Sequence, residues 1–170
     1  SLAVDPAGVL YVVDAGQDAV LLLEPNGYVK ATLGGPGTEE GQFDQPADID
    51  PTNGLVWVVA DAGNRRIQRF SRSFLHLESV PIFRGDRYET GRYAGTGSPG
   101  EQAARESGDG RPVGVAMSRA GEMFVLDAAQ GLVLKWDASR RFERAIGGYS
   151  RGAGSLSEPV ALAVSGDRLL

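Results

Sequence analysis

One segment of this sequence recurs along the chain at intervals of a few tens of residues. Residues 2–14 are matched by 49–61 and again by 115–127, and a fourth copy begins at 160. Each full copy runs from one apolar stretch through a glycine-containing turn into a second apolar stretch that ends in aspartate. Self-similarity at this period is typical of repeat folds, in which neighbouring repeats bury a shared core. We therefore expect an array of similar units.

The proline that closes each repeat sets the boundaries. Pro46 and Pro112 lie 66 positions apart, whereas Pro112 and Pro159 lie 47 apart, so the second repeat carries nineteen extra residues. We predict that these residues form an insertion at about 73–111. The predicted repeats, which together make one domain over residues 1–170, are 1–46, 47–112, 113–159 and an incomplete 160–170.

Within each repeat, short β-branched and aromatic runs alternate with Gly, Pro, Asn and Asp clusters, which indicates consecutive strands joined by tight turns. The first repeat predicts strands near 2–5, 9–13, 19–23 and 28–33. Four strands per repeat is the content of one propeller blade. We therefore expect an all-β fold, a β-propeller of four-stranded antiparallel blades, with three blades and the start of a fourth.

Two local departures from this pattern carry predictions of their own. The second repeat has one more residue than the first between its turn glycine and its aspartate. An extra residue in a paired strand forms a β-bulge, so we predict a bulge near Val59 and Ala60. We also predict a short helix at 101–106, inside the insertion.

The segment 61–70 follows the apolar run 57–59 and contains Gly63-Asn64 and then Arg66-Ile67. It resembles the NHL repeat, whose usual pattern is a hydrophobic Tyr-Val-x-Asp followed by Gly-Asn-x-Arg-Ile and a Phe. The run 41–46 is similar to the family's loop into the next blade. The resemblance implies a propeller of the six-bladed type. The first and third repeats lack the usual arginine.

Three blades and a start should not close into a ring, because known propellers have about four to eight blades. Both ends of such an array would expose unpaired strand edges and apolar blade faces. Two interpretations remain open. We favour a chain that is part of a longer one, and the alternative is two copies that assemble into one ring of roughly seven blades.

Composition and charge argue against several classes of partner. The formal net charge is −5 and the pI is about 4.9, whereas binding to nucleic acid or anionic lipid needs clustered cations. No apolar run approaches the length of a membrane span. We expect no nucleic-acid partner and no direct membrane insertion by this segment. The absence of cysteine excludes disulfides and thiolate chemistry. The compartment stays open, and the family resemblance favours the bacterial periplasm or the extracellular space.

Three aspartates recur where a strand meets a turn, and there a carboxylate can accept N–H bonds from the turn. We assign this structural role to Asp14, Asp61 and Asp127. The family resemblance implies that the loops entering the innermost strands and the loops linking second and third strands share one rim. We predict this rim as the partner-binding surface, with the candidate residues Gln17, Asp18, Asp48, Asn64, Arg65, Asp109, Arg111 and Gln130.

Three features suggest chemistry, and each has a simpler structural interpretation. The pattern Gly-x-Gly-x-x-Gly at 95–100 fits a dinucleotide site only inside a βαβ unit, which this sequence lacks. His76 is the only histidine, so a site built from several histidines is excluded. Arg66 and Arg69 point to opposite faces of a predicted strand and form no single basic patch.

We therefore expect a non-catalytic scaffold that binds a protein partner, or a subunit of a larger assembly, through its rim loops. We assign no catalytic, metal-binding or cofactor-binding residue, and we expect no cofactor in this segment. The alternative is a propeller enzyme, similar to the lyases and lactonases related to the NHL family, with a metal site in blades outside this sequence. A fold alone does not decide between them.

Overall fold

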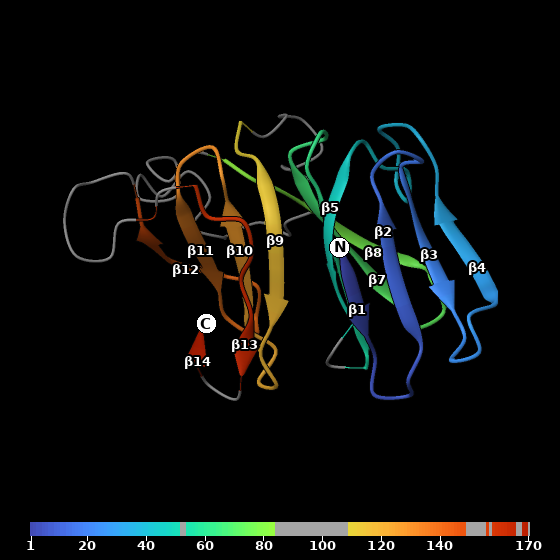
Figure 1. The fold of residues 1–170 in the computed structure, drawn as a ribbon. Helices are drawn as coiled ribbons and strands as arrows, with labels where there is room; N and C mark the ends of the chain where they lie inside the picture. Colours follow the sequence, from blue (N-terminus) through green and yellow to red (C-terminus); the bar gives the residue numbers. More distant parts are fainter. Residues whose placement is uncertain (52–53, 84–108, 149–155, 157, 166–167, 170) are drawn as a thin grey trace.

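The computed structural model describes residues 1–51, 54–83, 109–148, 156, 158–165 and 168–169. Within these residues it contains three four-stranded antiparallel sheets, a two-stranded hairpin and no helix (Figure 1). The all-β prediction is confirmed. The described part of the chain therefore offers no helix that could span a membrane.

Each sheet follows the chain without a crossover, so that strands consecutive in sequence are neighbours in space. We call the sheets blades 1 to 3. Blade 1 comprises β1 (Leu2–Val4), β2 (Leu10–Asp14), β3 (Ala19–Leu23) and β4 (Val29–Gly34). Blade 2 comprises β5 (Pro46–Asp50), β6 (Val56–Asp61), β7 (Arg66–Ser71) and β8 (His76–Pro81). Blade 3 comprises β9 (Pro112–Met117), β10 (Met123–Asp127), β11 (Leu132–Trp136) and β12 (Phe142–Gly147), and the hairpin comprises β13 (Val164–Ser165) and β14 (Arg168–Leu169).

In blades 1 and 3 the turn between the first two strands is closed by a side chain that accepts backbone N–H bonds. In blade 1 the Asp5 carboxylate accepts from Ala7 and Val9, both at 2.9 Å. In blade 3 the Ser118 hydroxyl accepts from the N–H of Glu122 at 3.1 Å. Both oxygens offer the backbone an alternative to the sheet ladder, and so end the strand. The serine of the third repeat thus replaces the aspartate of the first.

The predicted bulge near Val59 and Ala60 is wrong. Val59 pairs with Ile49 and Ala60 with Asp48, without interruption. The register shift falls on the opposite strand, between Pro46 and Asp48, and blade 3 has a shift at the matching place. Val59 lies ten positions after its partner, as in the matching pair of blade 1. The β1–β2 and β5–β6 hairpins are therefore equal in length, and the turn glycine of blade 2, Gly54, occupies a different position within its turn from Gly8 of blade 1.

The insertion predicted at 73–111 begins too early, because residues 76–81 form the fourth strand of blade 2. The connection from β4 to β5 has 11 residues, whereas the connection from β8 to β9 has 30. The nineteen extra residues therefore belong to the connection between blades 2 and 3. Residues 84–108 of this connection, with the helix predicted at 101–106 and the glycine pattern at 95–100, lie outside the described residues.

Side chains alternate between the two faces of each strand, and neighbouring blades share the buried sets. Tyr11 of blade 1 packs edge to face on Trp57 of blade 2, with ring centroids 4.9 Å apart. The next residue, Val58, points the other way and packs with Val125 and Leu134 of blade 3. Strand β6 is thus buried on both faces, which explains its unbroken apolar run.

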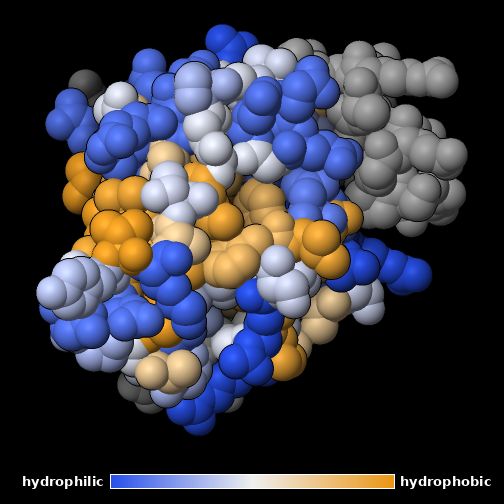
Figure 2. Space-filling model, turned by 90° about the vertical axis from the view of Figure 1, so that its right-hand side faces the viewer, coloured by the Kyte–Doolittle hydropathy of each residue, from blue (hydrophilic) through white to orange (hydrophobic). Residues whose placement is uncertain are grey.

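The face of blade 1 that points away from blade 2 is also apolar. Alternation places Leu2 and Val4 of β1 on it, and these side chains are 64% and 51% exposed. Figure 2, seen from the β4 side, shows apolar surface across the middle of the molecule between hydrophilic ends. The positions that match Val12 of this face, Val59 and Val125, are buried between blades. The face therefore has the composition of a contact between blades.

Candidate functional site

Two kinds of loop meet at one end of the blades, the upper end in Figure 1: those leading into the innermost strands and those linking second and third strands. A pocket of about 340 Å³ lies at this end, between blades 2 and 3. We call this end the rim and this cavity the rim pocket. Its lining residues, which come from both kinds of loop, are Gln45, Ala62, Gly63, Arg65, Asp109, Gly110, Arg111 and Ala129.

The blade 2 wall of the rim pocket is the turn 62–65 between β6 and β7. Gly63 donates its N–H to the Asp44 carbonyl at 2.8 Å, and a Cβ at Gly63 would lie only 2.4 Å from Asp44 Cγ. Glycine is therefore required for this close approach. The turn ends at Arg65, whose φ of 56° lies in the left-handed region. For a residue with a side chain this conformation costs about 1–2 kcal/mol.

Non-glycine residues with left-handed backbone recur at the rim. Asp18 and Arg65 end equivalent turns in blades 1 and 2, where blade 3 has Gly131. Gln45 and Glu158 take the same conformation one residue before a proline, where steric contact with the proline ring disfavours it. Because strain of this kind is concentrated at functional sites, it marks Gln45 and Arg65 among the lining residues.

The blade 3 wall consists of 109–111 and Ala129, and the buried carboxylate of Asp127 holds it. Asp127 accepts the N–H groups of Arg111 and Ala129, both at 2.9 Å. Gly110 donates to the Ile82 carbonyl at 2.9 Å, and a Cβ there would lie 2.6 Å from Ile82 Cγ2. The end of the connection from blade 2 is thereby fixed against blade 3.

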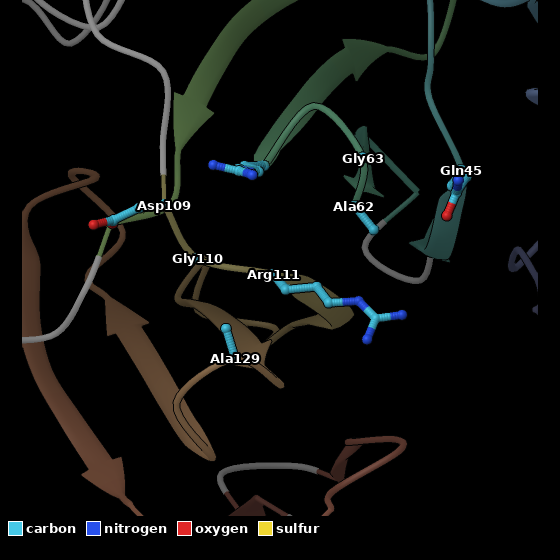
Figure 3. Close-up of a pocket in the computed structure, with 8 residues that line it drawn as sticks. Gln45, Ala62, Gly63, Asp109, Gly110, Arg111 and Ala129 are labelled. Atoms are coloured by element: carbon cyan, nitrogen blue, oxygen red, sulfur yellow. The ribbon is translucent and has the colours of Figure 1, made fainter.

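The rim pocket offers side-chain donors rather than backbone donors. The N–H groups of Gly63, Gly110 and Arg111 already donate within the fold, and that of Gln45 donates to the Asp18 carboxylate at 2.7 Å. In Figure 3 the Arg111 side chain extends toward the side where Gln45 lies, and the Asp109 side chain points the other way. No hydrogen bond or ion pair joins the Arg111 guanidinium to another described residue.

Four of the predicted rim residues bond within the rim instead of lining the pocket. Gln17 and Gln130 donate their side-chain amides to the turn aspartate of their own blade. Asp18 accepts the N–H of Gln45 from the next blade. Asn64 donates to a carbonyl of the loop that enters blade 2, at 2.9 Å. These side chains fix the loops relative to one another.

Asp48, also predicted for the rim, lies between the innermost strands. Its carboxylate accepts the N–H of Val115 at 2.9 Å and the hydroxyl of Ser1. The buried Asp50, to which the sequence reasoning gave no role, accepts the N–H of Met117 in the same way. The two carboxylates therefore bond β5 to β9, whose facing edges have no ladder between them.

The three recurring aspartates accept hydrogen bonds at the rim, with different environments. Asp14 is partly exposed and accepts the N–H groups of the turn that follows it. Asp127 and Asp61 are fully buried. Asp61 accepts from the Asp44 N–H and from the side chains of Asn64, Arg66 and Gln68. It therefore joins the β6–β7 turn, β7 and the loop from blade 1.

Gln68 is an important residue that the sequence reasoning missed. It is fully buried in β7, where its side chain donates to the Gln42 carbonyl at 2.6 Å and accepts the N–H of Gly41 at 2.9 Å. Arg66 donates to the same Gln42 carbonyl and to two further carbonyls of this loop. Four of the six residues of β7 are polar, so no local pattern marked this amide as buried, although a buried amide needs hydrogen-bond partners.

The other residues considered for chemistry lie outside the rim pocket. His76 lies on β8 with its side chain largely buried. Arg66 and Arg69 bond to different carboxylates, those of Asp61 and Glu78. Among the residues that the structure describes, no group of three His, Cys, Asp or Glu side chains is placed to hold a metal ion.

Three groups away from the rim pocket have shifted pKa values. Burial and a hydrogen bond to Asp5 raise the pKa of Tyr11. A hydrogen bond from Lys135, at 2.8 Å, lowers the pKa of Glu122. The bonds of Lys135 to Glu122 and Glu143 raise its own pKa. The shifts of Glu122 and Lys135 arise from contacts within blade 3, whereas Tyr11 is buried between blades 1 and 2.

Known structures match this arrangement of strands. A streptogramin B lyase has a TM-score of 0.64 and 14% identity, and the match covers 99% of this chain and 46% of that one. Virginiamycin B lyase from Staphylococcus aureus has a TM-score of 0.63 and 12% identity, with coverages of 99% and 46%. Hydrazine synthase from Kuenenia stuttgartiensis has a TM-score of 0.61 and 14% identity, with coverages of 98% and 38%.

No family model and no curated protein matches the chain. The chain spans less than half the length of the three structures named above. At these identities the likeness concerns the fold alone. These neighbours are β-propeller proteins, and the chain has three consecutive four-stranded antiparallel sheets. The chain has the fold of a partial β-propeller.

Proposed function

We propose that the chain is part of an NHL-type propeller that acts as a non-catalytic scaffold and binds a protein partner or subunit through its rim. The observation that carries this proposal is the rim pocket itself, where loops of two blades meet. Arg111 lies exposed there, while many other polar side chains of the rim bond within the fold.

The anchoring of the rim loops supports a binding role. Asp61 and Gln68 fix the loop that enters blade 2, and Asp127 fixes the start of blade 3. A surface ordered before binding loses little conformational entropy when a partner arrives. Long loops on a rigid scaffold are common binding surfaces, and the connection from β8 to β9 is the longest in the described fold.

The second candidate is an enzyme of the lyase or lactonase type, with its metal site in blades outside this sequence. The likeness to the streptogramin B and virginiamycin B lyases favours it. Conversion of streptogramin B by the protein would support this candidate. A scaffold should leave the compound unchanged, as followed by liquid chromatography, which separates a lyase product from its substrate even where the two have equal mass.

Co-purification from the native host tests the scaffold proposal. Arg111→Glu reverses a charge at the rim pocket, and Arg119→Glu does the same in the β9–β10 turn at the opposite end of blade 3. We expect Arg111→Glu to lose a partner that the unmodified protein and Arg119→Glu both retain, as quantified by mass spectrometry. Equal recovery of every partner from both variants would contradict binding at the rim.

A further inference from the structure

The turn that joins β3 to β4 in blade 1 contains an asparagine followed directly by a glycine. We infer that this pair, Asn26-Gly27, is a site of covalent self-modification, at which the backbone nitrogen of Gly27 attacks the Asn26 side chain to form a succinimide. Glycine has no Cβ to hinder attack by its nitrogen. The chain has two other asparagines: Asn64 precedes Arg65, and Asn53 lies outside the described residues.

The reaction balances with water as its only co-reactant. The Gly27 nitrogen forms a bond to Asn26 Cγ and loses its proton. The Cγ–Nδ2 bond breaks, and the side-chain nitrogen takes up that proton and leaves as ammonia. Water then opens the imide ring at either carbonyl, which yields aspartate or isoaspartate. In isoaspartate the backbone runs through the side-chain carboxyl carbon, so the main chain of the turn gains one methylene.

A hydrogen bond of the turn positions the Asn26 carboxamide for this attack. Its Oδ1 accepts the N–H of Tyr28 at 3.0 Å, and a bond of this kind folds the side chain over the backbone of the residue between. The carboxamide is thereby oriented toward the nitrogen that attacks it. Negative charge develops on Oδ1 as the new bond forms, and a donor already placed at that oxygen stabilises it.

The surroundings of the turn give the ring room to form. Asn26 and Gly27 are exposed, and no atom of a more distant residue lies within 4 Å of the position that a Cβ of Gly27 would take. The Gly27 N–H donates to the Glu24 carbonyl at 2.8 Å, which opposes loss of its proton. Such a bond in an exposed turn opens at low cost, because local openings concentrate in exposed loops.

The pair Asp109-Gly110 can form the same imide, with loss of water instead of ammonia, but its surroundings oppose the reaction. Gly110 is buried and donates its N–H to the Ile82 carbonyl at 2.9 Å. A Cβ at Gly110 would lie 2.6 Å from Ile82 Cγ2, so the backbone has little space to rotate into the ring. The fold thus exposes one such pair and protects the other, which makes position 109 an internal control.

Peptide mapping of the folded 170-residue chain after incubation tests the inference, with electron-transfer fragmentation to distinguish isoaspartate from aspartate. We expect isoaspartate at position 26, in amounts that rise with pH because the attacking nitrogen must lose its proton. Position 109 should show none in the folded protein and should acquire it in concentrated guanidinium chloride. Gly27→Arg should abolish isoaspartate at position 26, because its side chain hinders the attack.

The turn between β11 and β12 shows that the fold accepts this variant, because Arg140 takes the matching position there with a left-handed φ of 63°. Isoaspartate at position 26 in the denatured chain alone would overturn the inference, since the fold would then protect the turn. Aspartate without isoaspartate would also overturn it, because direct hydrolysis of the side-chain amide gives aspartate only. Equal isoaspartate in Asn26→Gln, whose longer side chain closes a larger ring more slowly, would place the reaction elsewhere.

Discussion

The aspartate at the end of the second strand differs between blades in its burial and in the number of hydrogen bonds it accepts. Asp14 accepts hydrogen bonds mainly from its own turn and stays partly exposed. Asp61 is fully buried and accepts donors from three separate segments, including the side chain of Arg66 at 2.7 Å. Loss of a buried acceptor is costly, because the donors that it leaves behind cannot form hydrogen bonds with water instead.

We predict that Asp61→Ala destabilises the fold by about 3–5 kcal/mol, because it leaves the partly buried Arg66 and several other donors without their acceptor. Asp14→Ala is the matched control and should cost about 1 kcal/mol, since water replaces the lost contacts. Urea denaturation of both variants measures the difference. Equal losses would show that burial of Asp61 does not matter to stability.

Tyr11 predicts how stability depends on pH. Burial and the hydrogen bond to Asp5 raise its pKa in the folded state, so the native protein keeps a proton that the unfolded chain loses above about pH 10. Stability must then fall as the pH rises past that value. Urea midpoints between about pH 8 and pH 11 should fall more steeply for the unmodified chain than for Tyr11→Phe. Parallel curves would contradict the assignment.

At the scale of elements, the loop 35–45 shows how one blade is fastened to the next. Gln68 and Arg66 of β7 bond to the backbone of this loop. Blade 3 has leucine at both matching positions, Leu132 and Leu134. Among the described residues, the connection into blade 3 is held instead by Asp127, which accepts the N–H of Arg111, and by Gln130, which donates to the Phe83 carbonyl.

Gln68→Leu places the residue of blade 3 in blade 2 and tests this fastening. We predict that the Gly41 amide, which donates to Gln68 at 2.9 Å, exchanges its hydrogen at least about tenfold faster in the variant, because its acceptor is gone. Leu134→Met, a substitution in β11 that conserves volume, serves as the control. Unchanged exchange at Gly41 would mean that other contacts hold the loop.

The strands and their order could be predicted from sequence, whereas the contacts between segments could not. Alternation of apolar residues fixes strand positions locally, and the predicted strand 19–23 of blade 1 matches β3. The partners of Asp48 and Gln68 lie 67 and 26 positions away, which no local pattern reveals. The bulge was misplaced for a related reason, since pairing rather than spacing locates it. Among the predicted rim residues, Arg65, Asp109 and Arg111 come together at the rim pocket.

At the scale of the whole molecule, the outward face of blade 1 is an apolar surface that the described residues leave exposed. Its positions match those that blades 2 and 3 bury against a neighbour, as Val12 matches Val59. Exposed contiguous apolar surface marks a site of association. Another blade is the partner that the internal repetition of the molecule indicates.

A pair of equivalent substitutions tests how this face behaves in the 170-residue chain. We predict that Val12→Lys costs less than about 1 kcal/mol and reduces self-association in sedimentation velocity runs. Val59→Lys should unfold the protein, because it buries an unpaired charge in the core between blades 1 and 2. Similar losses of stability from both substitutions would mean that Val12 is already covered.

Site-specific photo-crosslinking in the native host tests most directly whether the rim binds a protein. Ala129 lies exposed at the rim pocket, and Ala120 is also exposed, in the β9–β10 turn at the opposite end of the same blade. A benzoylphenylalanine at each position reports which end a partner touches. We predict one reproducible cross-linked protein from position 129 and none from position 120. Cross-links from 120 with none from 129 would contradict the account.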